Sequence, residues 1–362
     1  MKTSAPFRLF LLLAVVAGLA AIGSLSAPPV RESKRSFTKA GMLEDLVRQV
    51  IVPAYSNFTA ATDRLAGAGE GFSNQPNAQS LAEVQQAWRE AMLSWRSAQV
   101  LRSGPLLEVL GRIHFWPIRR QSVEKVLRDS RPINEGYIAE LGAPAVGLCA
   151  MESLLFDLKG GNETVLSNFQ GREAERRRSY LRALAADLSR QAKGVSAAWT
   201  ASGGYAGKFI ADGQESVNLM VNDLLQAVEI ATEERLKYAL DLQESKLLKP
   251  EYIQGAAAGI SHRSIVEVIR GAHRFYAGVV GFGLVAQLEQ IGSPTAQRVE
   301  RQFQTALKAL EAIGAPLEKT LPLDRAVVLR AYEECKTLEI LLKTEMASAL
   351  GVTLTFNSTD GD

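Results

Sequence analysis

The stretch Gly147-Leu148-Cys149-Ala150-Met151-Glu152-Ser153-Leu154-Leu155-Phe156 has the apolar spacing of a helix that is buried over one broad face. At about 100° per residue, apolar side chains line one arc of this helix: Leu148, Met151, Leu154, Leu155 and Leu158. Glu152 falls inside that arc, where a carboxylate costs free energy unless it is protonated, paired or bound to a cation. Cys149 lies one turn earlier on the same side. We therefore predict that Glu152 and Cys149 form the centre of a functional site.

Amphipathic segments of similar length dominate the rest of the chain, and the alternation typical of strands is nearly absent. The chain is rich in Ala and Leu and poor in aromatic residues, which favours helices over sheet. We predict an all-α fold of two up-and-down helical bundle halves packed together. The break Ser202-Gly203-Gly204 separates residues 38–201, with the Glu152 helix, from residues 205–362.

Local signals set several expected boundaries in these bundles. Residues 42–65 form a predicted helix that Pro53 kinks, followed by a glycine-rich loop over residues 67–77. The patterns Ser80–Glu83 and Ser264–Glu267 are candidate capping boxes that start the next helices.

The N-terminus has the pattern of a secretory signal. Lys2 and Arg8 precede the uncharged apolar run Leu9–Ile22, and small residues and prolines follow. We predict that residues 1–27 are a signal peptide, because the run is short for a membrane anchor. No cysteine lies near it, which excludes a lipoprotein. The expected location is therefore secreted or periplasmic, with membrane contact only through the signal.

Charge and cysteine content narrow the classes of function. The chain carries 41 Lys and Arg against 39 Asp and Glu, so loss of a signal holding only Lys2 and Arg8 leaves no net charge. That balance gives no indication of nucleic-acid binding. Cys149 and Cys335 are the only cysteines, so a zinc site built from clustered cysteines is excluded, although export would permit a disulfide.

Catalytic motifs are missing from the chain. It has no phosphate-binding glycine loop, no nucleophile elbow and no His-Glu-x-x-His pair. None of the three histidines, His114, His262 and His273, shares a helical turn with another, so a metal site would need ligands from distant segments. One irregular segment, residues 111–120, combines His114 and Trp116 with Arg112, Arg119 and Arg120; each arginine alone is more often structural.

Three motifs together resemble the imelysin family. Gly147-x-Cys149-x-x-Glu152 is similar to the family's Gly-x-His-x-x-Glu signature, and residues 112–117 resemble its Arg-Ile-x-Phe-Trp-Pro segment. The C-terminal stretch 350–362 resembles its closing Gly-Val-x-Leu-x-Phe-Asn-x-x-Asp-Gly-Asp. The resemblance covers nearly the whole mature chain. It implies an exported, all-helical protein of two domains, in a family that includes a claimed metallopeptidase and iron-regulated envelope proteins.

The resemblance makes Gly147, Glu152, Cys149, Arg112, Trp116 and Arg119 the candidate site residues, with Glu152 and His114 as candidate metal ligands. Two departures matter: Cys149 stands where the family has His, and Ile118 follows Pro117, where relatives often have an acid. A thiolate can bind zinc or iron, but a buried thiol simply fills space. For Glu152 we expect an arginine partner first, Arg112 or Arg119, then a metal ion, then protonation.

Two functions follow from the sequence. The first is a non-catalytic binding or accessory protein of the cell envelope linked to iron or metal handling, with a metal ion or an envelope protein as partner. The second is a zinc- or iron-dependent metallopeptidase with Glu152 as ligand or general base, completed by a histidine from another segment. A structural ion pair is an equally open role for Glu152.

Overall fold

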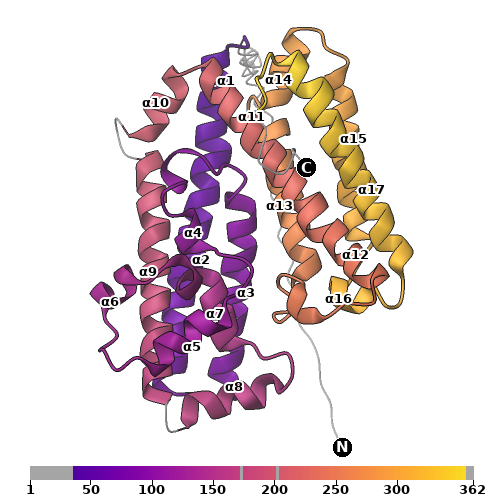
Figure 1. The fold of residues 1–362 in the computed structure, drawn as a ribbon. Coiled ribbons are helices and arrows are strands. Elements are labelled where there is room, and N and C mark those ends of the chain that lie inside the picture. Colours follow the sequence, from indigo (N-terminus) through magenta and orange to yellow (C-terminus); the bar gives the residue numbers. More distant parts are fainter. Residues whose placement is uncertain (1–35, 172–173, 201–203, 356–362) are drawn as a thin grey trace, which may run out of the picture. The chain divides into compact units, whose positions relative to one another are not determined.

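The computed structural model describes residues 36–171, 174–200 and 204–355, and within these ranges the chain is helical with no strand. Figure 1 shows long helices joined by short connections. The all-α prediction is therefore confirmed. The predicted signal peptide lies outside the described residues, as do residues 201–203, where we place the boundary between the halves. That boundary stays a prediction.

Long antiparallel helices build the N-terminal half: α2 (Val52–Asn74), α3 (Ala78–Ala98) and α9 (Ala174–Thr200). Their shared core includes Trp88 and Trp95, both fully buried on α3. Shorter helices complete this half: α1 (Lys39–Leu46), α4 (Leu110–Ile113), α5 (Arg120–Arg128), α6 (Glu135–Glu140), α7 (Gly147–Leu155) and α8 (Gly161–Gln170).

The C-terminal half is built on α11 (Gln214–Glu229), α13 (Ser261–Ala277), α15 (Thr295–Glu311) and α17 (Arg325–Leu341). A π-helical segment, η4 (Ile230–Lys237), continues α11 into α12 (Tyr238–Glu244). The remaining helices of this half are α14 (Leu284–Gln290), α16 (Leu317–Thr320) and α18 (Ala347–Ala349), whereas α10 (Tyr205–Ala211) packs against α1 and α9 of the N-terminal half.

Helix α13 packs against α3 and so connects the two halves. Gly271 of α13 permits this contact, because a Cβ there would lie 2.8 Å from Val100 Cγ2 and 2.9 Å from the Ser97 carbonyl oxygen. The C-terminal part of α3, which this contact holds in place, carries the residues of the site described below.

The predicted loop over residues 67–77 is wrong, because α2 continues to Asn74. A Cβ at Gly67 or Gly71 would meet open space, whereas one at Gly69 would contact Ala185 of α9 at 3.7 Å, and Phe72 is fully buried. Packing of this turn against α9 outweighs the low helix propensity of glycine. Pro53 is tolerated in the first turn of α2, after a π-helical turn over Val47–Ile51.

Neither predicted capping box lies at its expected place. The first is displaced by three residues, and α13 begins four residues early without a side-chain cap. In the first, the Asn77 side chain accepts a hydrogen bond from the Ser80 amide at 3.0 Å, and Ser80 Oγ accepts one from the Asn77 amide at 3.2 Å. Helix α13 begins at Ser261 rather than Ile265. Local patterns locate these helices, but the first residue depends on which side chain meets the free amides.

In the part of the chain that the structure describes, no helix combines the length and apolar character needed to span a membrane.

Candidate functional site

Helix α7 begins at a glycine that no other residue could replace without strain. Gly147 has φ +71°, a conformation that L side chains rarely adopt. A Cβ at this position would collide with the carbonyl oxygens of Arg112 and Ile113. The close approach places the start of α7 against the segment that leads to His114 and Trp116, and so brings two of the sequence motifs together.

Glu152 is buried as its position on the apolar arc predicts, with 2% of its surface exposed. Its Oε2 atom has no hydrogen-bond partner among the described residues. Burial raises the pKa of this carboxyl to about 7, and the positive charges of Arg96 and Arg120 oppose the rise without cancelling it. Glu152 is therefore a buried carboxyl that is partly protonated near neutral pH.

The neighbouring apolar positions follow the predicted arc with one exception. Leu148, Met151, Leu154 and Leu155 are all buried. Leu158 is 38% exposed because α7 ends at Leu155, and Phe156 has an extended backbone. The helical phase that placed Leu158 on the arc does not continue past that point.

Cys149 is buried one turn before Glu152. Burial is the main reason that the pKa of its thiol rises far above the ordinary value, and the Glu152 charge adds to the rise. The side chain is therefore a neutral thiol at physiological pH. Cys335 is also buried, and neither cysteine forms a disulfide.

The prediction that Arg112 or Arg119 pairs with Glu152 is wrong. Arg112 forms an ion pair with Asp187 at 3.3 Å and donates to the carbonyl oxygens of Ile138 and Leu141. Arg119 is exposed at the N-terminal end of α5 and forms no ion pair with Glu152. The Arg112 guanidinium is held by helix-end carbonyls and an acid of α9, which sequence spacing could not indicate.

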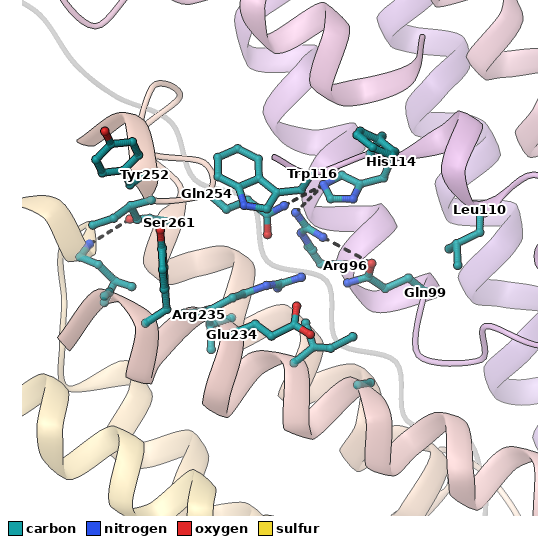
Figure 2. A pocket seen from close by; sticks show the side chains of 18 of the residues that line it. Arg96, Gln99, Leu110, His114, Trp116, Glu234, Arg235, Tyr252, Gln254 and Ser261 are labelled. Atoms are coloured by element: carbon teal, nitrogen blue, oxygen red, sulfur yellow. Dashed lines mark hydrogen bonds between the residues drawn. The ribbon is translucent and has the colours of Figure 1, made fainter. Parts of the chain in front are cut away.

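A cavity of about 320 Å³ lies beside the Arg112–Trp116 segment. Figure 2 shows it from close by, with side chains from both halves of the chain around it. The charged groups that line it within the described ranges are Arg96, Arg102, Arg235 and Glu234. We call this space the arginine cavity. Tyr238 and Tyr252 also line it and are each 45% exposed, so they lie at its mouth.

Arg96 is a buried arginine without a carboxylate partner. Its side chain on α3 is fully buried, yet it forms no ion pair with a described residue. Its Nη2 lies 3.0 Å from His114 Nε2, and its Nε has no hydrogen-bond partner in the described part of the chain. Burial lowers the pKa of the guanidinium to about 10, so it keeps its charge at neutral pH.

Arg235 approaches the same space from the C-terminal half. It lies in the π-helical segment η4, and Figure 2 shows its guanidinium directed toward that of Arg96. Its Nη1 is buried and has no hydrogen-bond partner in the described chain. Burial and the like charge of Arg96 lower the pKa of Arg235. Two guanidinium groups, each with one buried donor that no described residue accepts, therefore face one cavity, a costly arrangement for a folded protein.

His114 lies between these groups as a neutral acceptor. Arg96 and the Gln254 side-chain amide both approach its Nε2 at 3.0 Å, and each of them can only donate. Burial, followed by the charges of Arg96 and Arg235, lowers the pKa of His114 well below its ordinary value. Its accepting nitrogen is thus occupied by two donors.

Trp116 belongs to two cavities. A second space of about 480 Å³ is lined by Glu152, Arg119 and Arg120, and it shares Trp116, Tyr252 and Ile253 with the arginine cavity. Glu152 and His114 therefore line different cavities next to the same tryptophan.

The candidate metal ligands do not come together in a site that fits an iron or zinc ion. Within the described ranges, no three His, Cys, Asp or Glu side chains form a group that could bind a metal. His262 Nε2 lies 2.7 Å from the Leu310 carbonyl oxygen, and His273 is 3.0 Å from Glu300. Neither histidine joins Glu152, and Cys149 beside it is a neutral thiol.

Sequence reasoning missed Arg96 and Arg235, although a signal was present. Arg96 continues the stripe Trp88–Met92 at four-residue spacing, and Arg235 continues the stripe Val228–Ala231. Each is a charged residue on an apolar face, as Glu152 is. The rule that found Glu152 would have found both.

Comparisons with known proteins agree with this fold. A family model described as Imelysin matches residues 51–339. The iron-regulated protein A of Synechococcus elongatus is 26% identical over 311 residues, which is 80% of each chain. An imelysin-like protein from Psychrobacter arcticum has a solved structure with TM-score 0.70 at 17% identity, covering 89% of this chain and 99% of its own. A solved structure from Parabacteroides distasonis gives TM-score 0.73 at 18% identity, with coverage of 88% and 97%.

Proposed function

The chain belongs to the imelysin family, and from that premise we propose that it is an exported, non-catalytic binding protein linked to iron handling in the cell envelope. The link to iron rests on the iron-regulated relative, which aligns with four-fifths of this chain. Export rests on the apolar segment that follows Lys2 and Arg8.

The arginine cavity carries the binding role. A hydrolytic metal site needs several protein ligands and an open position, and the described residues offer no such group. They offer instead a cavity of about 320 Å³ lined by Arg96 and Arg235, each of which keeps one buried donor without a partner. Buried donors directed at an enclosed space are typical of ligand pockets, and the His114 nitrogen and the Ser261 hydroxyl that line this one are already engaged in hydrogen bonds within the protein.

Metal analysis and peptidase assays of the full-length protein test this function. We expect no hydrolysis of a protein substrate, with or without added zinc or iron, and no difference between the wild type and Glu152→Gln. Metal-dependent hydrolysis that Glu152→Gln abolishes would contradict the proposal. Fractionation of cells that express the natural leader tests export, because accumulation of the protein in the cytoplasm would contradict it.

One observation favours a metallopeptidase as the second candidate. The pKa of Glu152 is about 7 and its Oε2 is unpartnered, and a general base works best with a pKa near the working pH. Under this hypothesis Glu152 would activate a water molecule in the second cavity. The same assay decides between the two, since only this candidate requires activity that depends on Glu152.

A further inference from the structure

We propose that the arginine cavity is a binding site for a small multivalent oxyanion, a polycarboxylate or a phosphate, held between Arg96 and Arg235. This inference rests on the proposed binding function and gives it a class of ligand. It does not depend on Glu152, which lines the other cavity.

The first observation that supports an anion site is the excess of positive charge around the cavity. Three arginines line it against one glutamate, Glu234, which is exposed. His114 adds no positive charge because it accepts two hydrogen bonds in its neutral form. A positive space with poorly hydrated walls concentrates anions, because charges interact more strongly there than in bulk water.

Unused hydrogen-bond donors are the second observation. Arg96 Nε and Arg235 Nη1 are buried without partners among the described residues. Arginine presents its donors in a flat fork that matches the two oxygens of a carboxylate or phosphate. An oxyanion between the two groups would satisfy both donors and separate two like charges. No cation or neutral ligand would do both.

The placement of Arg96 and Arg235 is the third observation that supports an anion site. Arg96 stays in position through His114 Nε2 and, at 3.4 Å, through Gln99. Arg235 comes from the other half, on a π-helical segment, a geometry that recurs at functional sites. The site is therefore incomplete without both halves, and its ligand would connect them.

Polar and aromatic walls suit an extended anion. Gln254 and Ser261 line the cavity beside Trp116, and Tyr252 lies at its mouth. Ser261 Oγ already bonds Glu318 and the Leu317 amide. The Gln254 side-chain amide donates to His114, and its carbonyl oxygen accepts no hydrogen bond from a described residue. The charged contacts of a ligand would therefore fall to the arginines.

Isothermal titration calorimetry on the full-length protein tests the site. Citrate and inorganic phosphate are the two probes, in a buffer of low chloride, and acetate is the monovalent comparison. We expect saturable 1:1 binding of citrate or phosphate and at least about tenfold weaker binding of acetate, which brings a single negative charge to two guanidinium groups. Tighter binding of citrate would identify a polycarboxylate site, and tighter binding of phosphate a phosphate site.

Arg235→Gln is the informative variant, and Arg330→Gln is its matched control. Arg330 is an exposed arginine of the same half, on α17, and does not line the cavity. We expect Arg235→Gln to weaken binding by at least about tenfold, because it removes a charged hydrogen bond, and Arg330→Gln to bind as the wild type does. Arg235→Lys retains the charge but not the fork and should fall between them.

Each outcome bears on one proposal only. Equal affinities of Arg235→Gln and Arg330→Gln, or no saturable binding of either anion to a protein with wild-type circular dichroism, would overturn the anion site. Anion binding together with Glu152-dependent peptidase activity would overturn the non-catalytic function and leave the anion site standing.

Discussion

Two buried regions that share Trp116 carry unpartnered charges of opposite sign. In one, Glu152 lies on α7 with its carboxyl partly protonated near neutral pH, because burial raises its pKa to about 7. In the other, Arg96 keeps its charge with a pKa of about 10. A carboxyl can escape the cost of burial by taking up a proton at neutral pH, whereas a guanidinium cannot. The arginines therefore need a ligand more than Glu152 does.

The largest expected effect comes from the residue that joins the two regions. Gly147→Ala forces a left-handed backbone onto alanine and drives its Cβ into the Arg112 and Ile113 carbonyls. We expect a loss of about 3 kcal/mol or more in the free energy of unfolding, measured by urea denaturation. Gly161→Ala is the control, because Gly161 also starts a helix at φ +60° but has open space at its Cβ. Equal losses in the two variants would show that the carbonyl contact does not matter.

Glu152→Gln tests the carboxyl. The folded-state pKa of about 7 lies above the ordinary 4.5, so the folded protein holds this proton more tightly than the unfolded chain does. Stability should therefore fall as the pH rises from 4.5 through 7, by about 3 kcal/mol for this group. Glu152→Gln should match the wild type in acid and be more stable in mild alkali.

Urea denaturation across this pH range measures the effect, with Glu83→Gln, an exposed acid of α3, as the control. A wild-type stability that rises with pH while Glu152→Gln stays flat would mean that Glu152 has a positively charged partner in the fold.

Arg112→Gln tests whether the ion pair between Arg112 and Asp187 is independent of the Glu152 region. It removes one of the partners of the buried Asp187, which keeps Arg190. We expect a loss of about 2 kcal/mol with the pH dependence of Glu152 unchanged. The exposed pair of Arg128 and Glu124 provides the control, since Arg128→Gln should leave the urea midpoint almost unchanged. A steeper fall of stability with pH in Arg112→Gln than in the wild type would restore Arg112 as a partner of Glu152, because loss of a positive partner raises the pKa of the carboxyl further.

The smallest effect belongs to Cys149. Cys149→Ala leaves only a small void and removes a neutral thiol, so we expect a loss of about 1 kcal/mol and unchanged citrate or phosphate affinity. Thermal denaturation and the calorimetric titration measure the two quantities. A tenfold change in anion affinity would show that the thiol influences the arginine cavity through Arg96.

Patterns in the amino-acid sequence are enough to predict the helical class, the order of the main helices and the burial of Glu152. All three follow from spacing along one helix, since residues three or four apart share a face whatever surrounds them. The same spacing also places Arg96 and Arg235 on apolar helix faces, and they can be recognised by the criterion that identified Glu152, a charged residue on an apolar face. The sequence patterns did not predict the first residues of the helices. They also missed the helical glycine-rich turn of α2, because packing against α9 outweighs local propensity.

Which buried charges pair with one another depends on the tertiary structure. Arg112 lies close to α7 in space yet pairs with Asp187 of α9, while Arg96 and Arg235, 139 positions apart in the numbering, face one cavity. Spacing along one helix carries no information about which face of another helix lies opposite. The pairing of buried charges depends on that contact between helices, and so the sequence could name the buried carboxylate but not its surroundings.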